Sequence, residues 1–154
     1  MIKGLKFQKM MLEDIVAVHT INLEAYKDDP EPIEWFNEGI TNPQGYYYTA
    51  YIDDELVGYF GMYHNTSTTP HYCKIATLAI RPDFQRRGIG RAMMTKMLDI
   101  AKSLGLDRAK LEVDVNNPAL KLYSDMGFKI KEHIENYYDD TGDDAYIMWC
   151  YFAL

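Results

Sequence analysis

The sequence lacks the features that mark membrane-bound, secreted or metal-dependent chains. No apolar run approaches the roughly 20 residues that a helix needs to cross a bilayer, and residues 1–6 lack the apolar stretch of a secretory signal. The two cysteines, Cys73 and Cys150, lie far apart among apolar or aromatic neighbours, which predicts buried free thiols. The four histidines have no ligand spacing, so no metal site is expected. We therefore expect a cytoplasmic location and no membrane partner.

Linkers, repeats and positive charge are also scarce. No internal repeat, low-complexity tract or Gly/Ser-rich segment divides the 154 residues, so residues 1–154 are expected to form a single domain. Lysine and arginine number 16 against 23 aspartates and glutamates, which gives a net charge of −7. Because this charge repels a phosphate backbone on average, we expect no nucleic-acid partner. It suits a cationic partner such as an amine, and a monomer and a homodimer both stay open.

What is present is an alternation of strand-like and helix-like segments. The apolar periodicity predicts strands at residues 4–9, 46–52, 56–63, 72–80, 110–115, 128–137 and 145–152, and helices at residues 13–26, 32–38, 88–104 and 118–126. The strand–helix–strand order of residues 72–115 predicts a parallel pair with a right-handed crossover. The expected class is α/β (mixed α+β), with a mixed central sheet of six or seven strands flanked by about four helices.

Three local features of this pattern can be checked against a structure. The polar residues Asp53-Asp54-Glu55 predict the turn of a hairpin. The continuous apolar run at residues 75–80 predicts a strand buried on both faces. The residues Asp28-Asp29-Pro30 predict the end of the first helix.

The segment from Arg81 to Ala92 lies between a predicted buried strand and a long helix. Gly88 and Gly90 let the backbone approach a ligand closely, and the start of the helix offers unpaired N–H groups. Arg86, Arg87 and Arg91 add three positive charges around the two glycines of an otherwise acidic chain. Together these features predict a pyrophosphate site, whereas the glycines alone are more typical of a tight strand–helix turn.

Two segments resemble the GNAT superfamily of N-acetyltransferases. Gln85-Arg86-Arg87-Gly88-Ile89-Gly90 is similar to the family pattern Q/R-x-x-G-x-G/A. Asn116-x-x-Ala119-x-x-Leu122-Tyr123-x-x-x-Gly127-Phe128 is similar to N-x-x-A-x-x-L-Y-x-x-x-G-F, and the order of elements also agrees. The resemblance implies a GNAT-like fold and direct transfer of acetyl from acetyl-coenzyme A, a co-substrate, to a primary amine in a ternary complex. It also implies co-substrate contacts for Leu78, Ala79, Ile80, Gln85, Arg86, Arg87, Gly88, Ile89, Gly90, Arg91, Asn116 and Tyr123.

The resemblance also implies two catalytic side chains. Glu112, in the triplet Leu111-Glu112-Val113, takes the place of a general base, although a water relay or a merely outward-facing strand glutamate stays open. Tyr123 takes the place of the residue that protonates the departing thiolate, and its alternative is a tyrosine that packs within its helix.

The spacing between these two residues departs from the family pattern. From Glu112 to Tyr123 the chain is one residue shorter than usual, so either Asn116 is the motif asparagine or Asn117 caps the helix before Pro118. The two alternatives rotate the helix by about 100° relative to the strand.

The tail resembles the end of N-terminal (α-amino) acetyltransferases, including the type that modifies a ribosomal-protein alanine. The segment Glu135-Asn136-Tyr137-Tyr138 and the acidic turn after it carry this likeness, which implies acceptor contacts for Tyr26, Tyr137 and Tyr138. The alternative for the two tail tyrosines is an aromatic pair across a hairpin. The acceptor is therefore expected to be a protein or peptide N-terminus. A small-molecule amine (polyamine, amino sugar or amino acid) and a coenzyme A-binding module without turnover are the alternatives.

Overall fold

A computed structural model describes residues 2–27 and 30–152 of the chain. Its strands are β1 (Leu5–Lys9), β2 (Gly45–Ile52), β3 (Glu55–Asn65), β4 (Tyr72–Ile80), β5 (Arg108–Asp114), β6 (Lys129–Ile134) and β7 (Ala145–Tyr151). Its α-helices are α1 (Ile15–Ala25), α2 (Ile33–Thr41), α3 (Ile89–Ser103) and α4 (Leu120–Asp125), and short 3₁₀ turns cover Leu12–Asp14 and Pro82–Phe84. No helix of these described residues combines the length and the apolar character needed to cross a membrane.

The strands form one seven-stranded mixed sheet in the order β1-β2-β3-β4-β5-β7-β6. Strands β1, β2 and β3 pair antiparallel, as do β5, β7 and β6. Strands β4 and β5 are parallel, with Cys73 opposite Ala109 and Lys74 opposite Lys110. The predicted mixed sheet and the predicted parallel pair are therefore confirmed.

The chain divides into two compact units. The first unit comprises Met1–Tyr63 and Ala76–Met93, and the second comprises His64–Ile75 and Met94–Leu154. The division cuts through β4 and α3, so these two elements contribute residues to both units.

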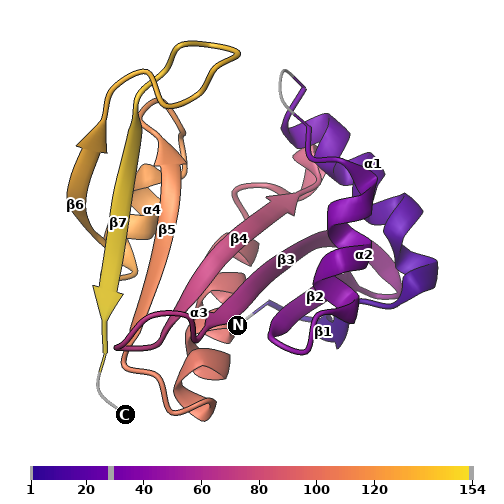
Figure 1. The fold of residues 1–154 in the computed structure, drawn as a ribbon. Coiled ribbons are helices and arrows are strands. Elements are labelled where there is room, and N and C mark those ends of the chain that lie inside the picture. Colours follow the sequence, from indigo (N-terminus) through magenta and orange to yellow (C-terminus); the bar gives the residue numbers. More distant parts are fainter. Residues whose placement is uncertain (1, 28–29, 153–154) are drawn as a thin grey trace. The chain divides into compact units, whose positions relative to one another are not determined.

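In the first unit, α1 packs against α2, and α2 packs against β2 (Figure 1). Val18 of α1 and Phe36 of α2 are fully buried with Tyr59 of β3. The Phe36 ring meets the Tyr59 ring edge-on, with 5.4 Å between ring centroids. The buried α1 positions are spaced by three or four residues, as one face of a helix requires.

In the second unit, residues alternate between two faces of β5. Ala109, Leu111 and Val113 are buried, and α4 lies behind this part of the sheet (Figure 1). Arg108, Lys110, Glu112 and Asp114 are the residues between them, and each is partly exposed. The opposite face of β5, which carries these four side chains, is called the open face below.

The structure contradicts the prediction that residues 75–80 are buried on both faces. Along β4, Cys73, Ile75, Thr77 and Ala79 are buried, but Ala76 is exposed and Leu78 is partly exposed. Burial therefore alternates along β4, and the sequence hides this alternation because apolar residues lie on both faces of the strand.

Two predicted boundaries were also wrong. The hairpin turn has two residues, Asp53 and Asp54, because Glu55 already pairs with Ile52 in the sheet. Both aspartates adopt left-handed backbone angles (φ 48° and 69°), which suit a tight hairpin. Strand β6 ends at Ile134, so Tyr137 and Tyr138 lie beyond it, and the alternative that they pair across a hairpin fails. The other predicted elements shift by up to three residues at their ends. Within the predicted stop at Asp28-Asp29-Pro30, both aspartates lie outside the described residues.

Candidate functional site

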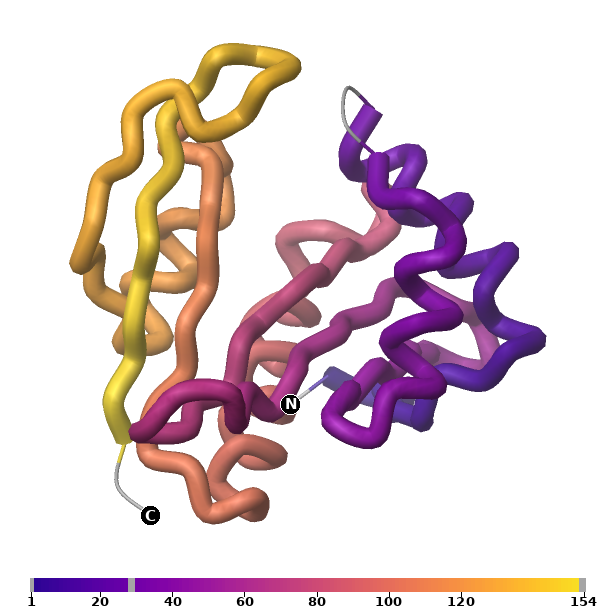
Figure 2. The backbone as a smooth tube through the Cα atoms, viewed as in Figure 1, coloured from indigo at the N-terminus to yellow at the C-terminus, as the bar shows by residue number. Residues whose placement is uncertain are grey.

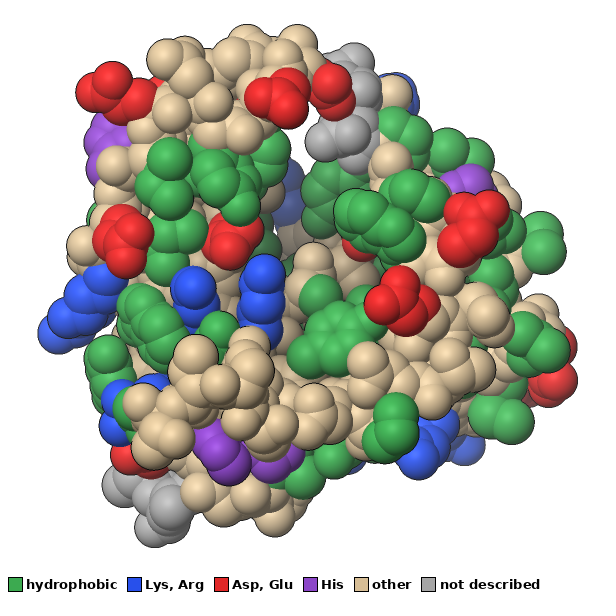
Figure 3. Space-filling model, viewed as in Figure 1, with side chains coloured by type: hydrophobic (Ala, Val, Ile, Leu, Met, Phe, Trp, Pro, Cys, Tyr) green, Lys and Arg blue, Asp and Glu red, His purple; other side chains and the backbone are tan. Residues whose placement is uncertain are grey.

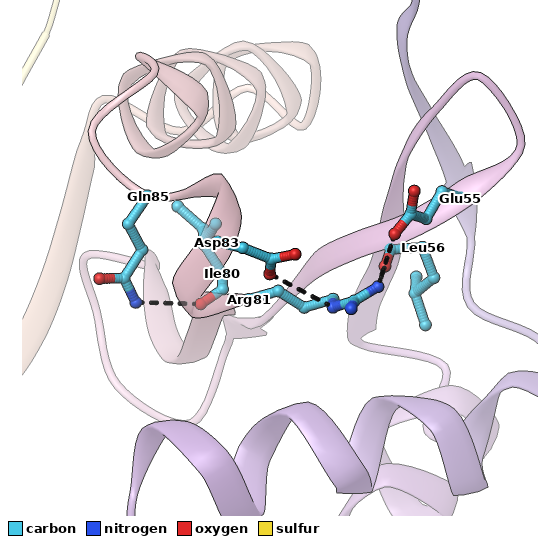
Figure 4. Close-up of polar contacts among 6 residues, drawn as sticks. All are labelled: Glu55, Leu56, Ile80, Arg81, Asp83 and Gln85. Atoms are coloured by element: carbon cyan, nitrogen blue, oxygen red, sulfur yellow. Dashed lines mark hydrogen bonds and ion pairs between the residues drawn. The ribbon is translucent and has the colours of Figure 1, made fainter.

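The loop that follows β4 is anchored firmly to β3 at its first residue. The Arg81 backbone N–H donates to the Val57 carbonyl at 2.8 Å. The Arg81 guanidinium bonds Glu55 Oε2 at 2.8 Å and lies 3.8 Å from Asp83 Oδ1 (Figure 4). These contacts fix the starting point of the loop that the sequence assigns to pyrophosphate.

Gln85 and Phe84 shape the middle of this loop. Gln85 Nε2 donates to the Ile80 carbonyl at 3.1 Å, so this side chain turns back toward the strand end (Figure 4). The Arg87 guanidinium lies 4.9 Å from the centre of the Phe84 ring. The Gln85 side chain therefore holds the loop against the end of β4, and its co-substrate contact stays a prediction.

The backbone of the loop then curls into the start of α3. Arg86 and Gly88 adopt left-handed angles (φ 63° and 86°), and Ile89 is buried while residues 85–88 are exposed. The Ala92 N–H donates to the Gly88 carbonyl at 3.1 Å, so the amide groups of the first turn precede the first intrahelical bond. Such a curled, amide-rich helix start suits a phosphate group.

On β4, the structure brings together two residues that the sequence predicted separately. The Tyr26 hydroxyl, one residue beyond α1, donates to the Leu78 carbonyl at 2.7 Å. A carbonyl oxygen has two lone pairs, so Leu78 can accept a second hydrogen bond from a ligand. Ala79 is buried and Ile80 is partly exposed.

A buried polar network beside Leu78 was missed by the sequence analysis. The Thr77 hydroxyl donates to Glu31 Oε1 at 2.5 Å, and Asn22 Nδ2 donates to the same oxygen at 3.1 Å. Asn22 also donates to the Tyr59 hydroxyl at 2.7 Å and accepts from the Glu31 backbone N–H at 2.8 Å. Asn22 and Glu31 are nine residues apart, a separation that matches no helix, strand or turn pattern, so the sequence analysis could not predict their hydrogen bonds.

On the open face of β5, Glu112 is joined to Tyr137. The Tyr137 hydroxyl donates to Glu112 Oε2 at 2.6 Å, and Lys74 Nζ lies 3.5 Å from Glu112 Oε1. Burial favours the neutral acid, but the hydrogen bond from Tyr137 and the charges of Lys74 and Lys110 outweigh it and lower the pKa of Glu112. The same hydrogen bond, with burial, raises the pKa of Tyr137. Glu112 is thus a carboxylate at neutral pH and a weak base.

The connection between β6 and β7 is held by Asp144. Asp144 accepts a bond from the Asn136 N–H at 2.9 Å and pairs with His133 Nε2 at 2.7 Å. The Asn136 bond and then the His133 contact lower the pKa of Asp144. The connection extends beyond the strand ends (Figure 2), and within it the Tyr137 and Tyr138 rings meet edge-on at 5.1 Å. The two tyrosines are therefore presented by an ordered loop rather than by a strand.

Tyr123 is fixed by the end of its own helix. The Phe128 N–H donates to the Tyr123 carbonyl at 3.0 Å and the Gly127 N–H to the Ser124 carbonyl at 3.0 Å, which is the Schellman arrangement. Gly127 takes the left-handed angle that this turn needs (φ 99°). Tyr123 is 7% exposed, and burial raises the pKa of its phenol to about 12. Within the described part of the chain its hydroxyl makes no hydrogen bond.

The turn before α4 separates the roles of the two asparagines. Asn117 Oδ1 accepts from the Ala119 N–H at 2.8 Å, two residues on, which closes a local turn ahead of α4. Asn116 donates its backbone N–H to Asp114 Oδ1 at 2.8 Å. Helix α4 begins at Leu120 with Ala119 at its N-cap position, so the alternative that Asn117 caps the helix is wrong, and the co-substrate contact of Asn116 stays a prediction.

These residues fall into both units. Tyr26, Leu78 and residues 85–91 belong to the first unit, whereas Glu112, Tyr123 and Tyr137 belong to the second. Among residues 2–27 and 30–152, no cluster of three or more His, Cys, Asp or Glu side chains is arranged to hold a metal ion. Both cysteines are buried free thiols, and burial raises the pKa of Cys73 to about 12.

Comparison with known proteins identifies the family of this chain. The acetyltransferase (GNAT) family matches residues 11–128. This chain belongs to the GNAT family. A putative [ribosomal protein bS18]-alanine N-acetyltransferase of Bacillus subtilis is 30% identical over 143 residues, 92% of each chain. The N-alpha-acetyltransferase RimI of Mycobacterium tuberculosis is 36% identical over 121 residues, 79% of this chain and 75% of the relative.

A solved GNAT structure has the same fold. The ribosomal-protein-S18-alanine N-acetyltransferase of Escherichia coli superimposes with a TM-score of 0.84 at 21% identity, covering 97% of this chain and 95% of that one. The family assignment and the mixed fold predicted from the sequence are confirmed, and the chain is an N-acetyltransferase of the GNAT type.

Proposed function

We propose that this GNAT protein transfers acetyl from acetyl-coenzyme A to the α-amine of a protein or peptide N-terminus. The observation that carries the proposal is the 2.6 Å hydrogen bond between Tyr137 and Glu112. It joins two sequence features, the Leu-Glu-Val triplet and the Asn-Tyr-Tyr segment, that each resemble α-amino acetyltransferases. The relatives named as α-amino acetyltransferases match across most of the chain and support the same acceptor class.

The loop of residues 85–91 fits the pyrophosphate of acetyl-coenzyme A. Its left-handed turns at Arg86 and Gly88 face solvent, and its cations balance a doubly negative group. We assign the phosphate contacts to the backbone of this loop and to Arg86, Arg87 and Arg91. Leu78 would hold the pantetheine arm through its remaining lone pair, next to Ala79 and Ile80.

The acceptor amine needs to lose one proton when its nitrogen bonds the acetyl carbon. A peptide α-amine titrates near pH 7.7–8.0, so a useful fraction is neutral at pH 7 and a strong base is unnecessary. Glu112, with its lowered pKa, suits this modest task, either by direct contact or through a water molecule. Its charge also attracts the ammonium form of the acceptor to the open face.

The departing thiolate needs to gain one proton when the carbon–sulfur bond breaks. We assign Tyr123 to donate a hydrogen bond to this sulfur. Because the pKa of Tyr123 is about 12, full proton transfer to a thiolate whose conjugate acid titrates near 8.5 is uphill. Tyr123 therefore stabilises the sulfur by hydrogen bonding, and solvent completes the proton transfer.

A polycationic small-molecule acceptor has less support. It would need the acidic turn at residues 139–144 as a counter-charge, but Asp144 is already engaged by His133 and by the Asn136 backbone. That carboxylate serves to shape the loop.

An acceptor screen tests the proposal. Peptides of varied N-terminus are compared with spermidine, an amino sugar and free amino acids, and the released thiol of coenzyme A is measured. We expect turnover of free N-terminal peptides and none of the same peptides with a blocked α-amine and an internal lysine. Preference for any small amine over every peptide would contradict the acceptor class, and absence of thiol release with all amines would contradict turnover itself.

A further inference from the structure

A cavity of about 560 Å³ lies on the second unit, and neither Glu112 nor Tyr137 is among its lining residues. Its charged lining consists of three cations, Arg108, Lys110 and Lys131, and no carboxylate is among its described lining residues. The chain as a whole carries a net charge of −7. A purely cationic cavity in an acidic protein therefore points to an anionic ligand.

Aromatic rings hold these cations in place. Lys110 Nζ lies 5.7 Å from the centre of the Tyr72 ring and 5.6 Å from that of Trp149. The Arg108 guanidinium lies 5.2 Å from the Tyr151 ring centre, and Lys131 Nζ lies 5.8 Å from it. Figure 3 shows lysine and arginine side chains beside hydrophobic ones in the region of β5, β6 and β7. Because a ring face engages only one side of an ammonium group, each lysine keeps N–H donors for a ligand.

The two lysines are the stronger candidates for contact with an anion. Arg108 already bonds Asp107 through Nε at 2.8 Å and through a terminal nitrogen at 3.2 Å, which offsets its charge. Lys110 and Lys131 lie against aromatic rings, and the charge of Lys110 also contributes to the lowered pKa of Glu112. Trp149 and Tyr151 stack with 6.2 Å between ring centroids and offer apolar surface between the cations.

The cavity continues the open face on which Glu112 lies. Lys110 is two residues from Glu112 along β5 and Arg108 is four, and alternate residues of a strand share a face. At about 3.3 Å per residue, these positions lie roughly 7 and 13 Å from Glu112 along the strand. An extended peptide advances by a similar length per residue. An acceptor whose amine lies at Glu112 and whose chain runs along β5 toward Arg108 would thus bring roughly its third to fifth residues beside the cavity.

We propose that this cavity binds the acceptor polypeptide itself and selects acidic side chains near its third to fifth residues. Their carboxylates pair with Lys110 and Lys131, and their apolar parts lie on Trp149 and Tyr151. This inference rests on the proposed function, because it places the acceptor amine at Glu112. A nucleic-acid strand fits less well, because outside the three cations the chain carries a net charge of −10 (−7 less +3), which repels a long polyanion.

Matched peptides test the proposal. Three peptides share their first two residues and their tail, and carry three glutamates, three glutamines or three lysines at positions 3–5. We expect the KM of the glutamate peptide to be about threefold to tenfold below that of the glutamine peptide, and that of the lysine peptide to be higher still, since each exposed ion pair contributes modestly. The turnover number should change little, and added salt should narrow the differences.

In the double variant Lys110→Gln/Lys131→Gln, the three peptides should have nearly equal KM values. Lys121→Gln is the control, because it removes one exposed cation of α4, which pairs with Asp125 at 3.1 Å and does not line the cavity. Equal KM values for the three peptides, a preference for lysine, or an unchanged order in the double variant would overturn the inference. Tighter binding of a single-stranded oligonucleotide than of the glutamate peptide, lost in the double variant, would also overturn it.

A binding measurement separates this inference from the proposed function. The glutamate peptide is given a blocked α-amine, and its affinity is measured by fluorescence anisotropy with wild type and the double variant. Binding that depends on Lys110 and Lys131 supports the cavity assignment even if the acceptor screen finds a small amine. Absence of such binding in an enzyme that acetylates peptides would overturn the cavity assignment and leave the acceptor class standing.

Discussion

The two units of this protein offer different kinds of groups to their predicted ligands. In the first unit the loop curls at Arg86 and Gly88, and Leu78 contributes a carbonyl, so most of the predicted ligand contacts come from the backbone. In the second unit the predicted contacts are the side chains of Glu112, Tyr123 and Tyr137. A backbone site depends on which angles a residue can adopt, whereas a side-chain site depends on single functional groups. The two units should therefore respond differently to substitution.

The largest effect is expected from Gly88→Glu in the first unit. Gly88 has φ 86°, and a new side chain would strain this turn and bring a carboxylate to the phosphate loop. We expect acetyl-coenzyme A affinity to fall by about 100-fold or more, measured by calorimetry. Gly105→Glu is a matched control, because Gly105 has φ 79° and no atom within 4 Å of an added Cβ. If both variants fold and lose similar amounts of affinity, the loop is not part of the acetyl-coenzyme A site.

Tyr123→Phe should give the next largest effect, and it acts on a side chain. The ring still packs on Phe128, whose centroid is 6.4 Å away, but the hydrogen bond to the departing sulfur is lost. We expect the turnover number to fall roughly tenfold to hundredfold, below the usual range for a full proton donor because the pKa of about 12 disfavours transfer. Affinity for acetyl-coenzyme A should stay within about twofold. Unchanged turnover would reduce Tyr123 to a packing residue.

The double variant Tyr137→Phe/Tyr138→Phe should have a smaller effect, confined to the acceptor. It keeps both rings but removes the hydroxyl that bonds Glu112. Because one hydrogen bond contributes about 0.5–1.5 kcal/mol, we expect the peptide KM to rise about threefold to tenfold and the acetyl-coenzyme A KM to stay constant. Tyr146→Phe is the control, because Tyr146 pairs with Val113 and so lies on the face of the sheet opposite to Glu112. An equal rise in both KM values would mean that the loop serves the fold rather than the acceptor.

The smallest expected effect concerns stability alone: apart from the loss of the proposed base, Glu112→Gln should change the pH dependence of stability. The folded-state pKa of Glu112 is lowered, so its contribution is present above the unfolded pKa of about 4.3 and is lost as pH falls through the folded value. Urea unfolding at pH 7 should show wild type more stable than the variant by at most about 1 kcal/mol. The difference should shrink at pH 3. A constant difference at both pH values would show that the ionised carboxylate is not what stabilises this face.

The elements with strong local signals were predictable from the sequence. Gly105 ends α3 as expected, with the Leu106 N–H bonded to the Ala101 carbonyl at 3.1 Å. The start of α3 after the loop at residues 85–88 was predicted because glycine and arginine precede an apolar helical pattern, and the pyrophosphate role of the loop stays a prediction. The parallel pairing of β4 and β5 followed from the length of the helix between them.

The rest depended on contacts between distant residues. Glu31, Asn22 and Thr77 meet only after folding, and nothing in their spacing announces a shared hydrogen-bond network. The cation-lined cavity likewise requires the pairing of Lys110 with Trp149 across β5 and β7. The alternation along β4 was hidden because both of its faces carry apolar residues. The roles of Glu112 and Tyr123 were inferred from resemblance, and they stay predictions.

The Schellman turn after α4 has a consequence for the short spacing between Glu112 and Tyr123. Tyr123 is tied to Gly127 and Phe128, which follow it, and the turn of residues 114–119 before the helix is held by separate bonds to Asp114 and Asn117. A residue gained or lost in that earlier turn changes the loop and leaves the phenol where the later turn sets it. In relatives of different length, counting back from the glycine therefore locates the equivalent hydroxyl, where counting forward from the strand would miss it by one helical position.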